Sequence, residues 1–191
     1  MPSDAVILTF DTSGAACLAA LSDQNGIIAT RVDEMARGQA EHLMPMLDEM
    51  LSSNGLTWSD LTRIGVGIGP GNFTGIRISV SAARGLALGL GIPAVGISTL
   101  DALLYAHPNQ TAAVKAPRDM AYTQSKGRNS ELVEATSVSD AIYPTDLTAL
   151  ITAMAHCAAK ADAATAERPK PLYIKPADAA PSRDAPPVML S

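Results

Sequence analysis

A glycine-rich segment between an apolar run and a long helical pattern constrains the fold of this chain most. It reads GIGPGNFTGIR from Gly67 to Arg77 and follows a predicted strand at Arg63–Ile68. Pro70 has a fixed φ and its flanking glycines tolerate positive φ, so the loop turns sharply. It then delivers the amides of residues 72–75 to the start of a helix that we predict to extend to Leu90. A strand, a tight loop and a helix in this order indicate an α/β fold.

Two helices with different apolar patterns flank this region. The helix predicted at Gln39–Ser53 has one broad apolar face, with acidic residues on the rest. The helix predicted at Thr74–Leu90 is apolar on nearly every side, which is typical of a helix buried on more than one face. One of its faces can cover a sheet, and the other needs a second helix or a partner protein.

The remaining pattern divides the chain into two lobes and a tail. Strands are expected at residues 5–10, 15–21 and 27–32, with an Asn25-Gly26 hairpin turn between the last two. A further strand at 92–97 and a short helix from about residue 99 complete a first lobe at residues 1–106. Short strands at 112–115, 121–125 and 132–138, with a helix at 147–164, indicate a reduced second lobe at 107–168. Six of the 13 prolines lie in residues 169–191, so we expect this tail to be extended or disordered rather than packed.

Composition excludes several classes of protein. The chain has 191 residues, 19 acidic and 14 basic, and a net charge of −5, so we expect it to be a poor nucleic-acid binder by itself. No apolar run is long enough for a transmembrane helix, and no basic segment precedes Val6–Phe10 as in a signal peptide. The two cysteines lie in alanine-rich surroundings and have no metal-like spacing. We therefore expect a cytoplasmic protein without a membrane partner.

Two segments are candidates for binding phosphate. Asp11, Thr12 and Ser13 follow the first strand, where an acid and hydroxyls can surround a metal-bound phosphate. The glycine-rich loop presents backbone amides at a helix start; its candidate residues are Gly69, Gly71, Asn72 and Thr74. It is neither a Walker A loop, since no GK[ST] follows, nor a dinucleotide fingerprint. Both segments also fit a structural role, as an Asx or Ser/Thr turn and as a helix start capped by Thr74.

Metal and nucleophile motifs are missing from the sequence. His42, His107 and His156 have no i, i+4 pairing, and no carboxylate is placed to complete a zinc site. No GxSxG segment is present. We predict no metal, no cofactor and no catalytic residue.

Four segments together resemble the bacterial TsaB (YeaZ) family. They are ILTFDTS at Ile7–Ser13, QAEHLMPMLDEML at Gln39–Leu51, GVGIGPGNFTGIRISVSAARGLALGLGIPAVGISTLDAL at Gly65–Leu103, and PLYIKPADA at Pro171–Ala179. The resemblance implies an actin-like ATPase (ribonuclease H-like) fold of two lobes with mixed sheets, the second lobe being truncated. It also implies a non-catalytic partner of TsaD. That enzyme, with TsaE, transfers threonylcarbamoyl to adenosine 37 of tRNAs that read codons beginning with A.

Three positions favour the non-catalytic interpretation. Thr99 and Leu103 stand where the resemblance places the two metal-binding histidines of TsaD, and neither suits iron or zinc. Lys115 stands where actin-like enzymes carry an acid, and a lysine cannot coordinate Mg²⁺. The alternative is a small ATPase or phosphotransferase that acts on its own through Asp11 and the glycine-rich loop. A third possibility, a peptidase, lacks both a metal pair and a nucleophile elbow.

The resemblance places the partner surface on the two helices. Small residues on the second helix permit close approach, and methionines on the first tolerate imperfect shape. The same surface can pair two copies of the chain when TsaD is absent. Substituting glutamate for Leu47 or Leu86 is expected to abolish pairing and leave the fold intact. The full predicted set is Leu43, Met46, Leu47, Met50, Ser79, Ala82, Ala83, Leu86 and Leu90.

Overall fold

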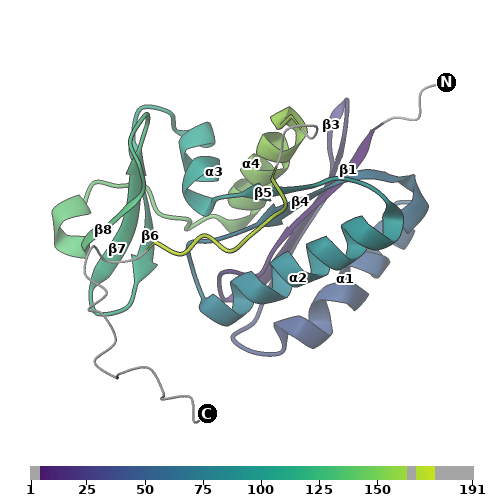
Figure 1. The fold of residues 1–191 in the computed structure, drawn as a ribbon, viewed down its shortest axis with the longest axis horizontal. Helices are drawn as coiled ribbons and strands as arrows, with labels where there is room; N and C mark the ends of the chain where they lie inside the picture. The colour runs from purple at the N-terminus through teal and green to yellow at the C-terminus, as the bar shows by residue number, and fades with distance from the viewer. Residues whose placement is uncertain (1–4, 163–166, 175–191) are drawn as a thin grey trace, which may run out of the picture.

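The computed structural model describes residues 5–162 and 167–174, and its main element is a mixed five-stranded sheet (Figure 1). The strand order is β3-β2-β1-β4-β5. The first three strands pair antiparallel, whereas β4 and β5 add parallel to β1. The strands are β1 (Val6–Asp11), β2 (Ala16–Asp23), β3 (Gly26–Glu34), β4 (Leu61–Gly67) and β5 (Ala94–Ile97).

Both faces of this sheet are covered by helices, which explains why β1 is buried along its whole length. Alternate residues of β1 enter opposite cores: Leu8 and Phe10 face α1 (Gln39–Ser53) and α2 (Phe73–Leu90), and Ile7 faces the other side. Figure 1 shows α1 and α2 side by side on one face and α4 (Leu147–Lys160) on the opposite face. The predicted first-lobe strands and helices are therefore all present.

The second sheet is an antiparallel meander of three strands. Its strands are β6 (Thr111–Ala116), β7 (Met120–Ser125) and β8 (Glu131–Glu134). The third strand is shorter than predicted because residues 135–138 form a 3₁₀ turn, η2 (Ala135–Val138). Helix α3 (Thr99–Ala106) contacts both this sheet and α4, and so joins the two lobes.

Helix α4 differs from the sequence prediction, which grouped it with the second lobe. It packs across β1 to β5 of the first sheet, where Ile151 and Met154 are fully buried. Arg63 of β4 holds its C-terminus by donating to the carbonyl oxygens of Ala158 (2.7 Å) and Ala161 (2.9 Å). These bonds satisfy acceptors that a helix end leaves unpaired. The helix ends at Lys160, short of the predicted residue 164, and residues 163–166 lie outside the described part.

Residues 167–174 are extended, and the described part of the predicted tail within them, residues 169–174, is packed against the protein, contrary to prediction. We call residues 167–174 the strap, which is the yellow ribbon of Figure 1. The amide of Leu172 donates to the carbonyl oxygen of Ile68 at 2.8 Å, and Pro169 is buried beside Gly96 of β5. Residues 175–191 lie outside the described part of the chain.

Within the residues described, no helix combines the length and apolar character that a membrane crossing requires.

Candidate functional site

The two segments predicted to bind phosphate meet in the structure. The turn after β1 lies against the loop that precedes α2, and the amide of Asn72 donates to the carbonyl oxygen of Ser13 at 2.7 Å. Gly71 approaches the same carbonyl so closely that a side chain would not fit. The hydroxyl of Thr12 donates to the carbonyl oxygen of Gly75 at 2.6 Å. Nothing in the sequence required these two segments to touch.

Two of the four amides at residues 72–75, those of Asn72 and Gly75, are occupied by the protein itself. The side-chain oxygen of Asn72 accepts from the Gly75 amide at 2.9 Å, and its carbonyl accepts from Ile76. Asn72 is therefore the N-cap, in place of the predicted Thr74, which lies exposed in the first turn. Asn72 has the extended backbone of an N-cap, whereas Thr74 is already inside the helix. The last loop candidate, Gly69, is buried with a φ of +92°.

Asp11 is turned inward rather than toward a ligand. Its side chain is 1% exposed, and its carboxylate accepts from the Ser13 amide (3.1 Å) and the Ser13 hydroxyl (2.8 Å). Desolvation raises the pKa of Asp11 above its usual value of 3.8, although the bonds from Ser13 oppose the shift. This is the geometry of a structural Asx turn, and it keeps the carboxylate from a bound metal–phosphate.

A cleft of about 560 Å³ opens between the lobes beside these loops. The first lobe contributes Ser13 and Asn72, and the second contributes Lys115, Tyr122 and Tyr143. No acidic side chain lines the cleft among the described residues, and Lys115 is exposed at its wall. Protein sites for Mg²⁺ usually include one or two carboxylates, and the described lining of this cleft supplies none, only neutral hydroxyl and amide oxygens.

The positions matched to metal-binding histidines lie inside the protein. Thr99 and Leu103 are both buried on α3, and the Thr99 hydroxyl has no hydrogen-bond partner among the described residues. In the same part of the chain, no three histidine, cysteine, aspartate or glutamate residues come together as a metal site. Burial raises the pKa of both Cys17 and Cys157 to about 11, so neither thiol is an activated nucleophile.

Six of the nine residues predicted to contact a partner are core residues of the monomer. On α1, all four predicted side chains pack against the sheet. On α2, Ser79 and Ala83 are also buried against the sheet. The Ser79 hydroxyl donates to the Gly67 carbonyl oxygen at 3.0 Å. In this structure these six cannot reach a partner. Helical periodicity identifies the apolar face of a helix but not what covers it. The buried six are Leu43, Met46, Leu47, Met50, Ser79 and Ala83.

The accessible apolar side chains of the two helices lie at other positions, and the most exposed of them are Leu88 (84%) and Phe73 (52%) of α2. Ala82, Leu86 and Leu90 from the predicted set are half-buried, and Ile78 extends their line at i, i+4 spacing. We call these four residues the α2 strip; they border the core that α1 also covers. Met44 on α1 adds a further side chain that is 38% exposed. Neither Ile78 nor Met44 belongs to the set predicted from the sequence, although the i, i+4 repeat could have identified Ile78.

Comparison with known proteins relates this geometry to one family. A family model described as "TsaD: tRNA N6-adenosine threonylcarbamoyltransferase" matches residues 25–175. The Escherichia coli K12 protein named "tRNA threonylcarbamoyladenosine biosynthesis protein TsaB" is 37% identical over 94 residues, which are 49% of this chain and 40% of that protein. The chain belongs to the TsaD family, in its TsaB (YeaZ) group. The Haemophilus influenzae protein of the same name is 35% identical over 123 residues, covering 61% of this chain and 51% of that one. The chain thus spans about half the length of these TsaB relatives.

Solved TsaB-group structures share the fold. The chain described as "YeaZ from Pseudomonas aeruginosa" superposes with a TM-score of 0.69 at 22% identity, over 89% of this chain and all of that one. A second Pseudomonas aeruginosa structure, described as "an uncharacterized protein with similarity to peptidase YEAZ", gives a TM-score of 0.72 at 22% identity, over 90% of this chain and all of that one. Together with the mixed sheet, these likenesses confirm the α/β actin-like ATPase (ribonuclease H-like) fold.

Proposed function

We propose that this chain is a non-catalytic subunit that pairs with TsaD and, with TsaE, supports threonylcarbamoylation of adenosine 37 in tRNAs reading ANN codons. It acts in the cytoplasm. The observation that carries the proposal is the state of Asp11, buried and bonded within its own turn beside a cleft without acidic side chains among the described residues. The first lobe thus keeps the fold of the family but has no carboxylate placed to hold a metal–nucleotide. Such a lobe is suited to binding the related subunit TsaD.

The α2 strip and Met44 form the surface that we assign to TsaD. The side chains of the strip are already partly packed on the core, so they are held in place before a partner arrives. Burying about 800 Å² per partner at about 25 cal/mol/Å² offsets the cost of association in a standard interface. The same surface joins two copies of the chain when TsaD is absent.

Reconstitution tests this proposal directly. TsaD and TsaE are purified with and without the full chain, and threonylcarbamoyladenosine is measured in an unmodified tRNA that reads an ANN codon. We expect co-purification with TsaD and product only in the reactions that contain the chain. Full product formation without it would refute the proposal.

A small ATPase acting alone is the second candidate, and it rests on the cleft and its two phosphate-type loops. Lys115 and the inward Asp11 count against it. We expect the isolated chain to release no phosphate from Mg-ATP above buffer. Turnover that disappears in Asp11→Ala would establish the ATPase and overturn the non-catalytic assignment.

A further inference from the structure

Charge is unevenly distributed over this acidic chain. Residues 61–100 contain three arginines and no aspartate or glutamate, although the whole chain has 19 acidic residues. The exposed side of α1 carries Glu41, Asp48 and Glu49. The exposed side of α2 carries only basic charge, and the strap beside it adds Arg168 and Lys170, the second of which pairs with Glu167 at 2.6 Å. The surface formed by α2 and the strap is therefore basic on a protein of net charge −5.

A groove of about 520 Å³ lies on this basic face, between the C-terminal half of α2 and the strap. Arg84 and Arg168 line it from opposite sides, and Ala87, Ile92 and Pro93 supply apolar walls. In the described residues no carboxylate pairs with either arginine, and none lines the groove. Two unpaired guanidinium groups at one groove are suited to phosphate oxygens.

An exposed aromatic cluster occupies the other end of the same face. The rings of Phe73 and Tyr173 stack with centroids 5.4 Å apart and an interplanar angle of 28°. The Arg77 guanidinium lies 3.8 Å from the centre of the Phe73 ring, and its Nε donates to the Tyr173 hydroxyl at 3.2 Å. Phe73 and Tyr173 nevertheless remain 52% and 45% exposed. Arg77 thus covers part of the Phe73 ring and holds the pair in place, while about half of each residue stays exposed.

Arg77 and Arg84 are seven residues apart on α2, so they lie on one side of the helix about 10 Å apart along its axis. Aromatic rings beside arginines form a recurring surface for unpaired nucleotides, because bases stack on the rings while the cations contact phosphates. An acidic peptide would use the arginines but would gain little from the exposed rings. The combination favours RNA.

We propose that the α2–strap face binds an unpaired RNA segment, with phosphates at Arg84 and Arg168 and a base stacked on the cluster of Phe73 and Tyr173. The inference rests on the proposed function, because it names the part of the tRNA-bound assembly that this chain contacts. The α2 strip faces the α1 side, so one helix presents separate surfaces to protein and to RNA.

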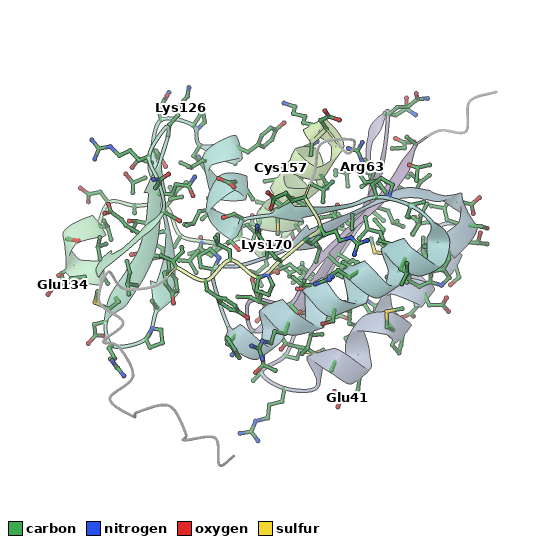
Figure 2. The ribbon with its side chains drawn as sticks, viewed as in Figure 1. Glu41, Arg63, Lys126, Glu134, Cys157 and Lys170 are labelled. Carbon is green, nitrogen blue, oxygen red and sulfur yellow. The ribbon has the colours of Figure 1, made fainter. Side chains whose placement is uncertain are left out.

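Fluorescence anisotropy with the full chain tests this surface. The probe is a labelled anticodon stem–loop RNA, compared with a fully paired RNA of equal length and with polyglutamate as competitor. The test variants are Arg84→Glu/Arg168→Glu and, for stacking, Tyr173→Ala beside Tyr173→Phe. Lys126→Glu/Arg128→Glu is the charge-matched control, because both residues are exposed in the turn of the second lobe; Figure 2 places Lys126 far from Lys170 on the strap.

We expect the stem–loop to bind more tightly than the paired RNA. The double arginine variant should bind the stem–loop about tenfold more weakly than the parent. The slope of log Kd against log[salt] should be smaller by roughly 1 to 2 in this variant, because fewer phosphate contacts are made. Tyr173→Ala should lose about fivefold or more, and Tyr173→Phe should bind as the parent does.

Four results would each overturn the RNA assignment. The first two are an equal loss of affinity in the control pair and no binding of the stem–loop. The other two are equal affinity for the paired RNA and complete displacement of the stem–loop by polyglutamate. TsaD pairing of the arginine variant is measured separately. If the arginine variant loses RNA binding but still pairs with TsaD, the two surfaces are distinct. The RNA inference can then fail without the proposed function failing.

Discussion

Thr12 and Gly75 fix the two loops of the interlobe cleft against each other. The Thr12 hydroxyl donates to the Gly75 carbonyl oxygen, and the Gly75 Cα lies so close to the Thr12 carbonyl oxygen that a Cβ would overlap it. The obstructing atom belongs to the backbone, so it cannot rotate away as a side chain can. The first turn of α2 is thereby locked to the turn after β1.

Replacing Gly75 by alanine should destabilise the protein by about 2–3 kcal/mol, because the two backbones must separate to admit a methyl group. Gly89 on the same helix is the matched control, since it is exposed and a Cβ there meets only open space. Gly89→Ala should stabilise by about 0.5–1 kcal/mol. Urea unfolding of both variants measures the difference. Equal effects would show that the contact at Gly75 imposes no constraint.

Leu86→Glu should fold normally but lose TsaD pairing by at least about tenfold, because a charge then enters the α2 strip. Ile28→Glu is the control, since Ile28 is 40% exposed on β3, away from α2. It should pair as the parent does. Circular dichroism and calorimetric titration with TsaD supply the two readouts. Undiminished pairing of Leu86→Glu would place the partner surface elsewhere.

Leu47→Glu should behave differently, although the sequence alone suggests it as an equivalent interface probe. Leu47 is fully buried between α1 and the sheet, so the variant places an unpaired charge in the core. We expect little or no folded protein by circular dichroism. A folded Leu47→Glu protein that only lost pairing would restore the original interface assignment.

Asp11 should make stability depend on pH in a defined direction. Burial raises its pKa in the folded state above the unfolded value of 3.8, so the folded protein holds the proton more tightly. Its contribution to stability is therefore greatest below pH 3.8 and is lost as pH rises through the folded pKa. An asparagine side chain carries no such charge, so Asp11→Asn should gain stability relative to the parent as pH increases from about 4 to about 7. Urea unfolding at both pH values measures this gain, and a constant difference would contradict it.

The strap should loosen when its aromatic contact is removed. Tyr173→Ala loses both the stack on Phe73 and the bond from Arg77, and should cost about 1–2 kcal/mol. Tyr173→Phe keeps the stack and should cost about 0.5 kcal/mol or less. Urea unfolding ranks the two variants. Equal losses would assign the strap's attachment to the hydrogen bond rather than to the rings.

The spacing of apolar residues predicted most of the secondary structure, because the periodicity of strands and helices depends on residues that are close in sequence. The helix at Gln39–Ser53 was placed to the residue, and the helix after the glycine-rich loop to within one. The helix cap was misplaced because two local signals compete. Thr74 and Asn72 are both good caps, and only the backbone conformation of Asn72 settled which one acts.

The candidate site was predictable in its segments but not in its geometry. The sequence indicated that Asp11 follows a strand and that glycines precede a helix. Whether the carboxylate points into a cleft or into its own turn depends on hydrogen bonds with Ser13 that no spacing rule specifies. Likewise, Phe73 and Tyr173 are about a hundred residues apart, and only the folded strap brings their rings together.

The amino-acid sequence alone determined the family, the order of strands and helices, and which side of each helix is apolar, because these follow from motifs and from periods of two and 3.6 residues. Only the tertiary structure decided what covers each apolar side. Leu47 looks no different from Leu86 along the chain, yet the sheet buries one and leaves the other half-exposed. Burial is a property of packing between segments distant in sequence, and local spacing does not encode it.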